Sequence, residues 1–221
     1  MKREFLTTGD GSVTIHLPEW NEQYHSKHGA LAEAQHVFIK TGLYHFVELH
    51  KPKNISILEI GFGTGLNALL TLLEAKTNQL TISYHGVEGY PVAVNEVEHL
   101  NYAEIVNTDL NLFLSLHSCD WEKPQVLSPY FTLTKRELFF DQIEDIDAYH
   151  IIYFDAFGAR VQPELWTELI FEKMYHALKD GGVLVTYSAK GSVRRAMQAV
   201  GFTVERLPGP PVKREMLRAT K

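Results

Sequence analysis

Residues 57–67, with the sequence ILEIGFGTGLN, decide the fold class. A short apolar run is followed by three glycines at alternate positions, Gly61, Gly63 and Gly65, and a second apolar run starts at Leu66. This order is typical of a buried strand, a glycine loop and a helix. Such a loop brings backbone N–H groups and the positive end of a helix close to a ligand. The segment therefore predicts a binding loop at the end of a strand.

The segments on either side alternate between predicted strands and helices. Strands are predicted at residues 55–60, 80–87, 129–133, 147–155, 183–187, 202–206 and 214–219, and helices within residues 33–49 and at 66–75, 93–98, 107–116, 163–178 and 193–200. Ser192 is predicted to cap the last helix and Gly201 to end it. The final two strands are expected to form an antiparallel hairpin at the edge of the sheet.

This order predicts an α/β fold, in which a partly parallel, Rossmann-like sheet carries helices on both faces. Residues 1–50 are expected to be an N-terminal extension that packs on the core, and residues 51–221 to form the main domain. A chain of 221 residues suits one large domain.

Composition excludes several classes of protein. No apolar run is long enough to span a membrane, and the first residues lack the apolar segment of a secretory signal. Cys119 is the single cysteine, and no cluster of histidines and cysteines has the spacing of a metal site. We therefore expect a soluble, cytoplasmic protein that binds neither a membrane nor a metal.

The charge is unevenly distributed along the chain. The whole chain has a formal charge of −6, but residues 190–221 contain eight Lys or Arg against two Glu and carry +6. A basic C-terminal region on an acidic body favours an anionic ligand, although a solvated hairpin explains it equally well.

The glycine spacing distinguishes between nucleotide ligands. A dinucleotide loop requires G-x-G-x-x-G, whereas this chain has Glu59-x-Gly61-x-Gly63-x-Gly65, the pattern of class I methyltransferases that bind S-adenosylmethionine. Glu59 is expected to anchor the loop or the amino group of the cofactor. Glu88 lies 23 residues after Gly65, at the end of the next predicted strand, where a carboxylate can accept hydrogen bonds from both ribose hydroxyls.

Asp155 is the candidate catalytic residue, because it ends a strand deeper in the predicted sheet, where open α/β folds bind their ligands. Methyl transfer requires an acceptor with a free lone pair. A carboxylate beside an amine can orient it and accept its proton. The alternative interpretation is that Asp155 caps the helix that follows.

Five segments resemble one family, the methyltransferase domain of the bifunctional tRNA 5-methylaminomethyl-2-thiouridine biosynthesis proteins. They are YHSKHGALAEAQHVFI at residues 24–39, GFGTGLN at 61–67, DAFGARVQPELWT at 155–167, SAKGSVRRAMQAVGF at 188–202 and KREML at 213–217. The resemblance covers most of the chain. It implies N-methylation, with S-adenosylmethionine, of 5-aminomethyl-(2-thio)uridine at the tRNA wobble position.

The resemblance also implies roles for individual residues. Residues 61–65, Asn67 and Glu88 would bind the cofactor, Phe157 would line the pocket, and Asp155 would face the methyl-transfer centre. The tRNA anticodon stem-loop would meet a basic surface of four side chains, Arg194, Arg195, Lys213 and Arg214.

Two features depart from the family pattern. Residues 131–140, FTLTKRELFF, lack the aspartate that can contact adenine, so no adenine contact is assigned there. No second glycine fingerprint occurs, so we expect methylation alone, with the aminomethyl group made by other enzymes and a separate flavin-dependent oxidoreductase as a further partner. The alternatives are methylation of another RNA or a small amine, or a partner subunit that binds the cofactor without catalysis.

Overall fold

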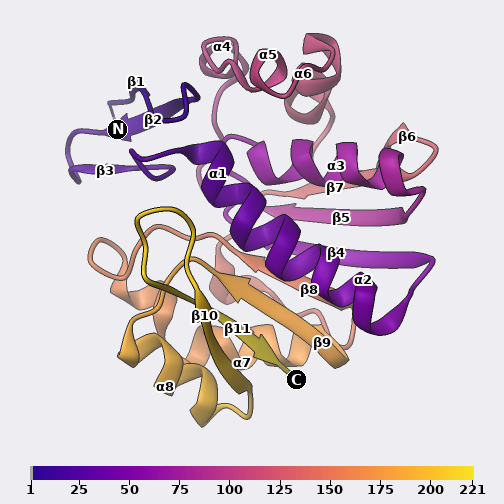
Figure 1. The fold of residues 1–221 in the computed structure, drawn as a ribbon, viewed down its shortest axis with the longest axis vertical. Coiled ribbons are helices and arrows are strands. Elements are labelled where there is room, and N and C mark those ends of the chain that lie inside the picture. Colours follow the sequence, from indigo (N-terminus) through magenta and orange to yellow (C-terminus); the bar gives the residue numbers. More distant parts are fainter. Residues whose placement is uncertain (1) are drawn as a thin grey trace.

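The computed structural model describes residues 2–221. Its centre is an eight-stranded sheet with the strand order β10-β11-β9-β8-β4-β5-β7-β6 (Figure 1). The strands are β4 (Asn54–Ile60), β5 (Thr81–Val87), β6 (Gln125–Ser128), β7 (Phe131–Arg136), β8 (Tyr149–Phe154), β9 (Leu178–Thr186), β10 (Thr203–Pro208) and β11 (Glu215–Thr220). The five strands from β7 to β9 run parallel, and both edges are antiparallel. The predicted α/β class is confirmed, and so is the antiparallel hairpin of β10 and β11 at the sheet edge.

The side chains of β4 explain why the sheet is covered on both faces. Ile55 and Ile57 pack into one hydrophobic cluster, whereas Leu58 and Ile60 pack into a second, because successive side chains of a strand point to opposite faces. Both sets are almost completely buried. The strand therefore needs helices on each side of it.

The first face is covered by one long helical segment and by the helix that follows the glycine loop (Figure 1). The long segment consists of α1 (Ala30–Ala34), a π-helix η1 (Gln35–Tyr44) and α2 (His45–His50), and it ends where Lys51 takes a left-handed conformation. The predicted helix within residues 33–49 is thus confirmed. The other elements of this face are α3 (Leu66–Asn78), α4 (Val94–Val97), α5 (Tyr102–Ile105) and α6 (Leu110–Ser118).

The second face is covered by η2 (Phe140–Gln142), η3 (Pro163–Trp166), α7 (Glu168–Ala177) and α8 (Gly191–Ala199). The helix predicted at residues 163–178 is divided, because a 3-10 turn that starts at Pro163 is followed by a new helix after Thr167. The predicted cap by Ser192 is wrong, since α8 begins at Gly191, but Gly201 does follow its end with a positive φ. None of the helices within residues 2–221 is long and apolar enough to cross a membrane.

A small antiparallel sheet precedes the long helical segment. It consists of β1 (Glu4–Thr7), β2 (Val13–Leu17) and β3 (Glu22–Gln23). Ile15 and Leu17 of β2 are buried in the same cluster as the first face of the main sheet. Residues 2–50 therefore share a hydrophobic core with the main sheet.

Candidate functional site

The glycine loop joins β4 to α3 as predicted, and its backbone conformation requires glycine. Gly61 has φ +88°, and a Cβ at this position would lie 2.8 Å from the carbonyl oxygen of Asp155. Gly63 has φ +49° and lies against the ring of Tyr24. A side chain at either position would meet both backbone strain and an occupied neighbour. Gly65 packs on His117 and caps the start of α3 rather than lining the cavity.

Glu88, directly after β5, fixes the middle of this loop. One oxygen of its carboxylate accepts a hydrogen bond from the Gly63 N–H at 2.9 Å, and the other accepts one from the Tyr90 N–H at 2.9 Å. Burial raises the pKa of Glu88, whereas these N–H donors lower it. Each oxygen of the carboxylate can accept a further hydrogen bond, and Glu88 is one of the residues that line the cavity.

Asp155 lies directly after β8, beside the glycine loop. Its N–H donates to the carbonyl of Ile60, and its carboxylate accepts a hydrogen bond from the Asn67 side chain at 2.9 Å. The same Asn67 nitrogen donates to Glu59 at 2.9 Å. Asn67 therefore bridges two carboxyl groups that would otherwise repel each other.

The structure places Glu59 and Asn67 behind the main cavity. Glu59 is 1% exposed and Asn67 3%, and both line a separate cavity of about 20 Å³ beneath the loop. Desolvation raises the pKa of Glu59 well above its usual range. In this arrangement Glu59 reaches Asp155 through Asn67. Their expected contact with a cofactor stays a prediction.

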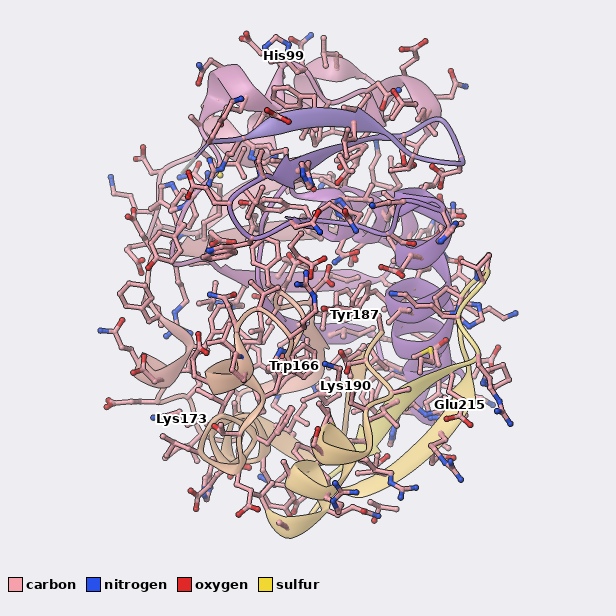
Figure 2. All side chains as sticks on the ribbon, turned by 90° about the vertical axis from the view of Figure 1, so that its left-hand side faces the viewer. His99, Trp166, Lys173, Tyr187, Lys190 and Glu215 are labelled. Atoms are coloured by element: carbon pink, nitrogen blue, oxygen red, sulfur yellow. The ribbon has the colours of Figure 1, made fainter. Side chains whose placement is uncertain are left out.

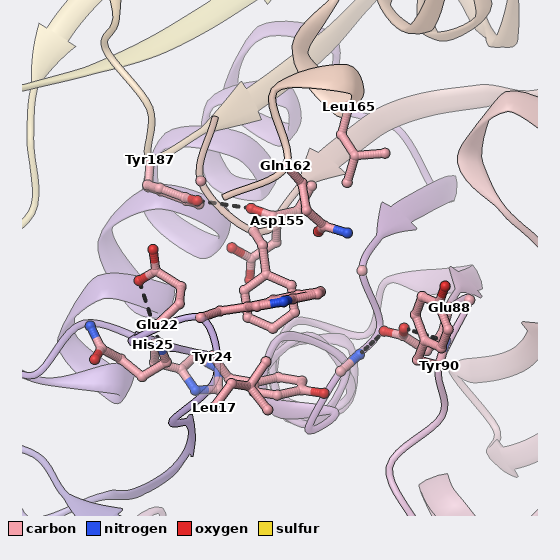
Figure 3. Close-up of a pocket in the computed structure, with 18 of the residues that line it drawn as sticks. Leu17, Glu22, Tyr24, His25, Glu88, Tyr90, Asp155, Gln162, Leu165 and Tyr187 are labelled. Atoms are coloured by element: carbon pink, nitrogen blue, oxygen red, sulfur yellow. Dashed lines mark hydrogen bonds between the residues drawn. The ribbon is translucent and has the colours of Figure 1, made fainter. Parts of the chain in front are cut away.

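The main cavity has a volume of about 800 Å³, in the range of small-molecule sites. In Figure 3, Glu88 and Tyr90 lie at one end of it, and Asp155 and Tyr187 at the other. Aromatic rings form much of the wall near Asp155. Phe157 makes edge-to-face contacts with Tyr24, at 4.9 Å between ring centroids, and with Trp20, at 5.8 Å.

Charged side chains gather at the Asp155 end. Glu33 of α1 and Lys213 of the β10–β11 loop form an ion pair there, and the Lys213 ammonium lies 4.3 Å from the centroid of the Tyr187 ring. The Tyr187 hydroxyl donates to the carbonyl of Ala156 at 2.8 Å. Burial, with a smaller contribution from Glu33, raises the pKa of Asp155 to about 7, while Asn67 and Lys213 oppose the shift.

The four side chains of the predicted basic surface are not equivalent. Arg195 and Arg214 are exposed, and Arg194 is half-buried on α8. Lys213 instead lines the main cavity, with its side chain 33% exposed. Lys190, the residue before α8, comes three residues after Tyr187, which lines the cavity; both are labelled in Figure 2.

Several residues of the cavity were not predicted as site residues, above all Glu33, Tyr24 and Tyr187. Tyr24 and Glu33 fall within the resembling segment at residues 24–39, but no local spacing marks them as site residues. Within residues 2–221, no group of three metal-binding side chains comes together.

The parallel sheet, the glycine loop after β4 and acids after β5 and β8 define a class I methyltransferase fold with its cavity at the carboxyl ends of the strands. Residues 134–221 match the profile of a family described as S-adenosyl-L-methionine-dependent methyltransferase. The predicted class of enzyme and its cofactor are thereby confirmed.

The relatives that match this chain carry the name of the family that its sequence resembles. The chain is 27% identical to the tRNA 5-methylaminomethyl-2-thiouridine biosynthesis bifunctional protein MnmC of Polaromonas naphthalenivorans, over 97% of this chain and 35% of that protein. The protein of the same name from Hydrogenovibrio crunogenus is 29% identical to this chain, over 89% of this chain and 31% of that protein. The chain thus spans about a third of the length of these relatives.

Solved structures confirm the fold. MNMC2 from Aquifex aeolicus superposes with a TM-score of 0.80 at 25% identity, over 99% of this chain and 70% of that one. Spermidine synthase from Thermotoga maritima, at 16% identity and a TM-score of 0.60, shares the fold over 99% of this chain and 68% of its own. The predicted resemblance to the methyltransferase domain of the bifunctional protein is confirmed by these similarities.

Proposed function

We propose that this protein N-methylates 5-aminomethyl-(2-thio)uridine at the wobble position of tRNA with S-adenosylmethionine. The observation that carries the proposal is the position of Asp155, at the carboxyl end of β8, beside the glycine loop and inside an aromatic-walled cavity. The MnmC relatives, which cover most of the chain, support the choice of substrate.

The residues present fit the cofactor. Gly61 and Gly63 leave the loop backbone without Cβ atoms, and Glu88 places a carboxylate in the cavity lining at the adjacent strand end. When bound, S-adenosylmethionine supplies an electrophilic methyl group on a sulfonium. Gly61, Gly63 and Glu88 would hold it, and the exposed rings of Tyr90 and Phe139, 5.7 Å apart at the same end, offer apolar surface for an adenine.

Asp155 supplies the acid–base chemistry. An amine attacks only through an unprotonated nitrogen, and a carboxylate whose pKa is about 7 is matched to accept its proton near neutral pH. Asn67 holds the carboxylate in place, and the aromatic wall of Phe157 and Tyr24 limits water around the acceptor. Phe157 thus serves as a wall of the pocket.

The basic surface would position the RNA. Arg194 and Arg195 lie on α8, which begins four residues after the cavity residue Tyr187, and Arg214 follows the cavity residue Lys213. Phosphate contacts orient a nucleic acid without reading its bases, which suits delivery of one uridine into the cavity. We also propose a flavin-dependent oxidoreductase as the partner that supplies the amine.

The test is methylation of tRNA that carries 5-aminomethyl-uridine by the purified protein, followed by mass spectrometry of the nucleosides. The expected product is 5-methylaminomethyl-uridine, formed only with S-adenosylmethionine and not by Asp155→Asn at a comparable rate. Cofactor binding without methylation of this tRNA would refute the proposal and favour a non-catalytic partner subunit. Methylation of other positions would favour another RNA substrate.

A further inference from the structure

Lys213 occupies an unusual position for a surface loop residue. The loop between β10 and β11, drawn yellow in Figure 1, extends from the sheet edge toward the start of α1. Its Lys213 ammonium contacts the carboxylate of Glu33, whose side chain is 11% exposed, and lies over the face of the Tyr187 ring. A carboxylate and an aromatic face together form a site for an alkylammonium group. In this structure the loop fills that site with a lysine.

Several titratable groups lie around Asp155 at this end of the cavity. They are Glu33 on α1, Glu59 on β4, Tyr84 on β5, Tyr102 on α5, Tyr187 after β9 and Lys213 on the β10–β11 loop. Lys213 is the cation among them. A buried carboxylate without a partner is strongly destabilising, so Glu33 requires a positive charge beside it.

We propose that Lys213 is the resident counter-ion of an amine-binding subsite, and that the ammonium group of the methyl acceptor replaces it on Glu33 and Tyr187. The proposal rests on the proposed methylation of a primary amine. Lys213 carries the same chemical group as an aminomethyl acceptor, namely a primary ammonium on a methylene carbon. Its side chain is one-third exposed, so it has a path back to solvent.

The loop fixes the backbone of Lys213, so only its side chain would have to move for the exchange. Val212 adopts φ +65°, a conformation that a β-branched residue rarely accepts, and Lys213 is held from within the loop by the hydrogen bond from its N–H to the carbonyl of Pro210. Glu33 lies on a helix packed against the sheet and stays in place. The acceptor would thus bind to the fixed carboxylate of Glu33 after displacing the Lys213 side chain.

The subsite predicts opposite effects for its two charged members. Glu33→Gln removes the carboxylate that binds the acceptor, so affinity for an amine should fall roughly tenfold or more. Lys213→Met removes the competitor, so the same affinity should rise. If the ion pair only fastened the loop, both substitutions would weaken binding. Lys76→Met, an exposed position on α3, is the matched control for loss of a lysine.

The experiment is calorimetric titration of 5-aminomethyluridine nucleoside, in the presence of S-adenosylhomocysteine, into the wild type and these variants. 5-Hydroxymethyluridine is the uncharged comparison, and affinity for S-adenosylhomocysteine reports correct folding. We expect Glu33→Gln to abolish the preference for the amine and Lys213→Met to increase it. Weaker amine binding in Lys213→Met, or an unchanged preference in Glu33→Gln, with cofactor affinity intact, would overturn the proposal.

This measurement is independent of turnover, so it separates the two proposals. A wild-type protein that prefers the amine but methylates no aminomethyl-uridine tRNA would refute the proposed function and support the subsite. A protein that methylates this tRNA but binds both nucleosides equally would support the proposed function and refute the subsite.

Discussion

At the scale of single residues, the ionised Asp155 carboxylate should promote methyl transfer but lower the stability of the fold. Asp155→Asn keeps the shape and removes the charge that accepts the proton, so single-turnover methylation should slow about a hundredfold. In the wild type, the rate should rise with pH through about 7, where the Asp155 carboxyl ionises. Rapid-quench assays over about pH 5.5–8.5, the range in which such a carboxyl group titrates, measure both effects. An undiminished rate would make Asp155 structural.

The same substitution should stabilise the fold. The folded-state pKa of Asp155, about 7, lies above that of an unfolded chain, so its protonated form is favoured by folding. That contribution is fully present below the unfolded pKa and is lost as pH rises through about 7. The Tm advantage of Asp155→Asn should therefore grow between about pH 4 and pH 7. Thermal melts in that range check it; a constant difference would mean that the carboxyl is not desolvated.

Glu88 should matter for the cofactor rather than the acceptor. Glu88→Ala removes charge-assisted contacts and also frees the Gly63 N–H that positions the loop. Affinity for S-adenosylmethionine should fall roughly ten- to a hundredfold. Calorimetry measures it, with NAD as the comparison ligand. Tight binding of NAD in place of S-adenosylmethionine would contradict the assignment of the glycine loop.

At the scale of elements, the β4–α3 loop requires glycine both for its left-handed backbone and for its close contact with the end of β8. Two glycines allow these two requirements to be measured separately. Gly61→Ala combines φ +88° with a Cβ 2.8 Å from the Asp155 carbonyl, whereas Gly11→Ala has φ +84° and open space around it. Each should lose about 1–2 kcal/mol of stability from the left-handed backbone. Only Gly61→Ala should also displace the end of β8 and weaken cofactor binding. Urea unfolding and calorimetry on both variants test this, and equal cofactor affinity would refute the role of the contact.

The elements also explain how far the sequence could predict the site. Gly61, Glu88 and Asp155 each follow an apolar strand, and parallel strands bring their carboxyl ends to one edge, so the local pattern was sufficient to predict that these three residues lie together. The contact of Glu33 with Lys213 joins residues 180 positions apart through a loop whose path no periodicity records. β1 was missed because all four of its side chains are exposed and show no alternation. The helix expected from Pro163 is divided at Thr167, whose extended backbone separates the 3-10 turn from α7.

At the scale of the whole molecule, a protein with a net negative charge can bind RNA only where its positively charged side chains gather on one surface. Arg194 and Arg195 lie on α8 and Arg214 lies in the β10–β11 loop, whereas the Lys213 side chain pairs with Glu33 at the cavity. Lys51, Lys53 and Lys76 are exposed as well, and the first two lie at the opposite end of β4 from the glycine loop. These three lysines provide a control that removes the same charge elsewhere.

The triple substitution Arg194/Arg195/Arg214→Ala should therefore weaken binding of every tRNA alike, because phosphate contacts carry no sequence information. Each lost phosphate contact should flatten the dependence of log affinity on log salt by about one unit. The Lys51/Lys53/Lys76→Ala control should leave that slope nearly unchanged, since it alters net charge but not the contact surface. Filter binding across a salt series measures the slopes, with cofactor affinity as the test of folding. Equal effects of the two triple variants would mean that net charge alone attracts tRNA, and would move its binding surface away from α8.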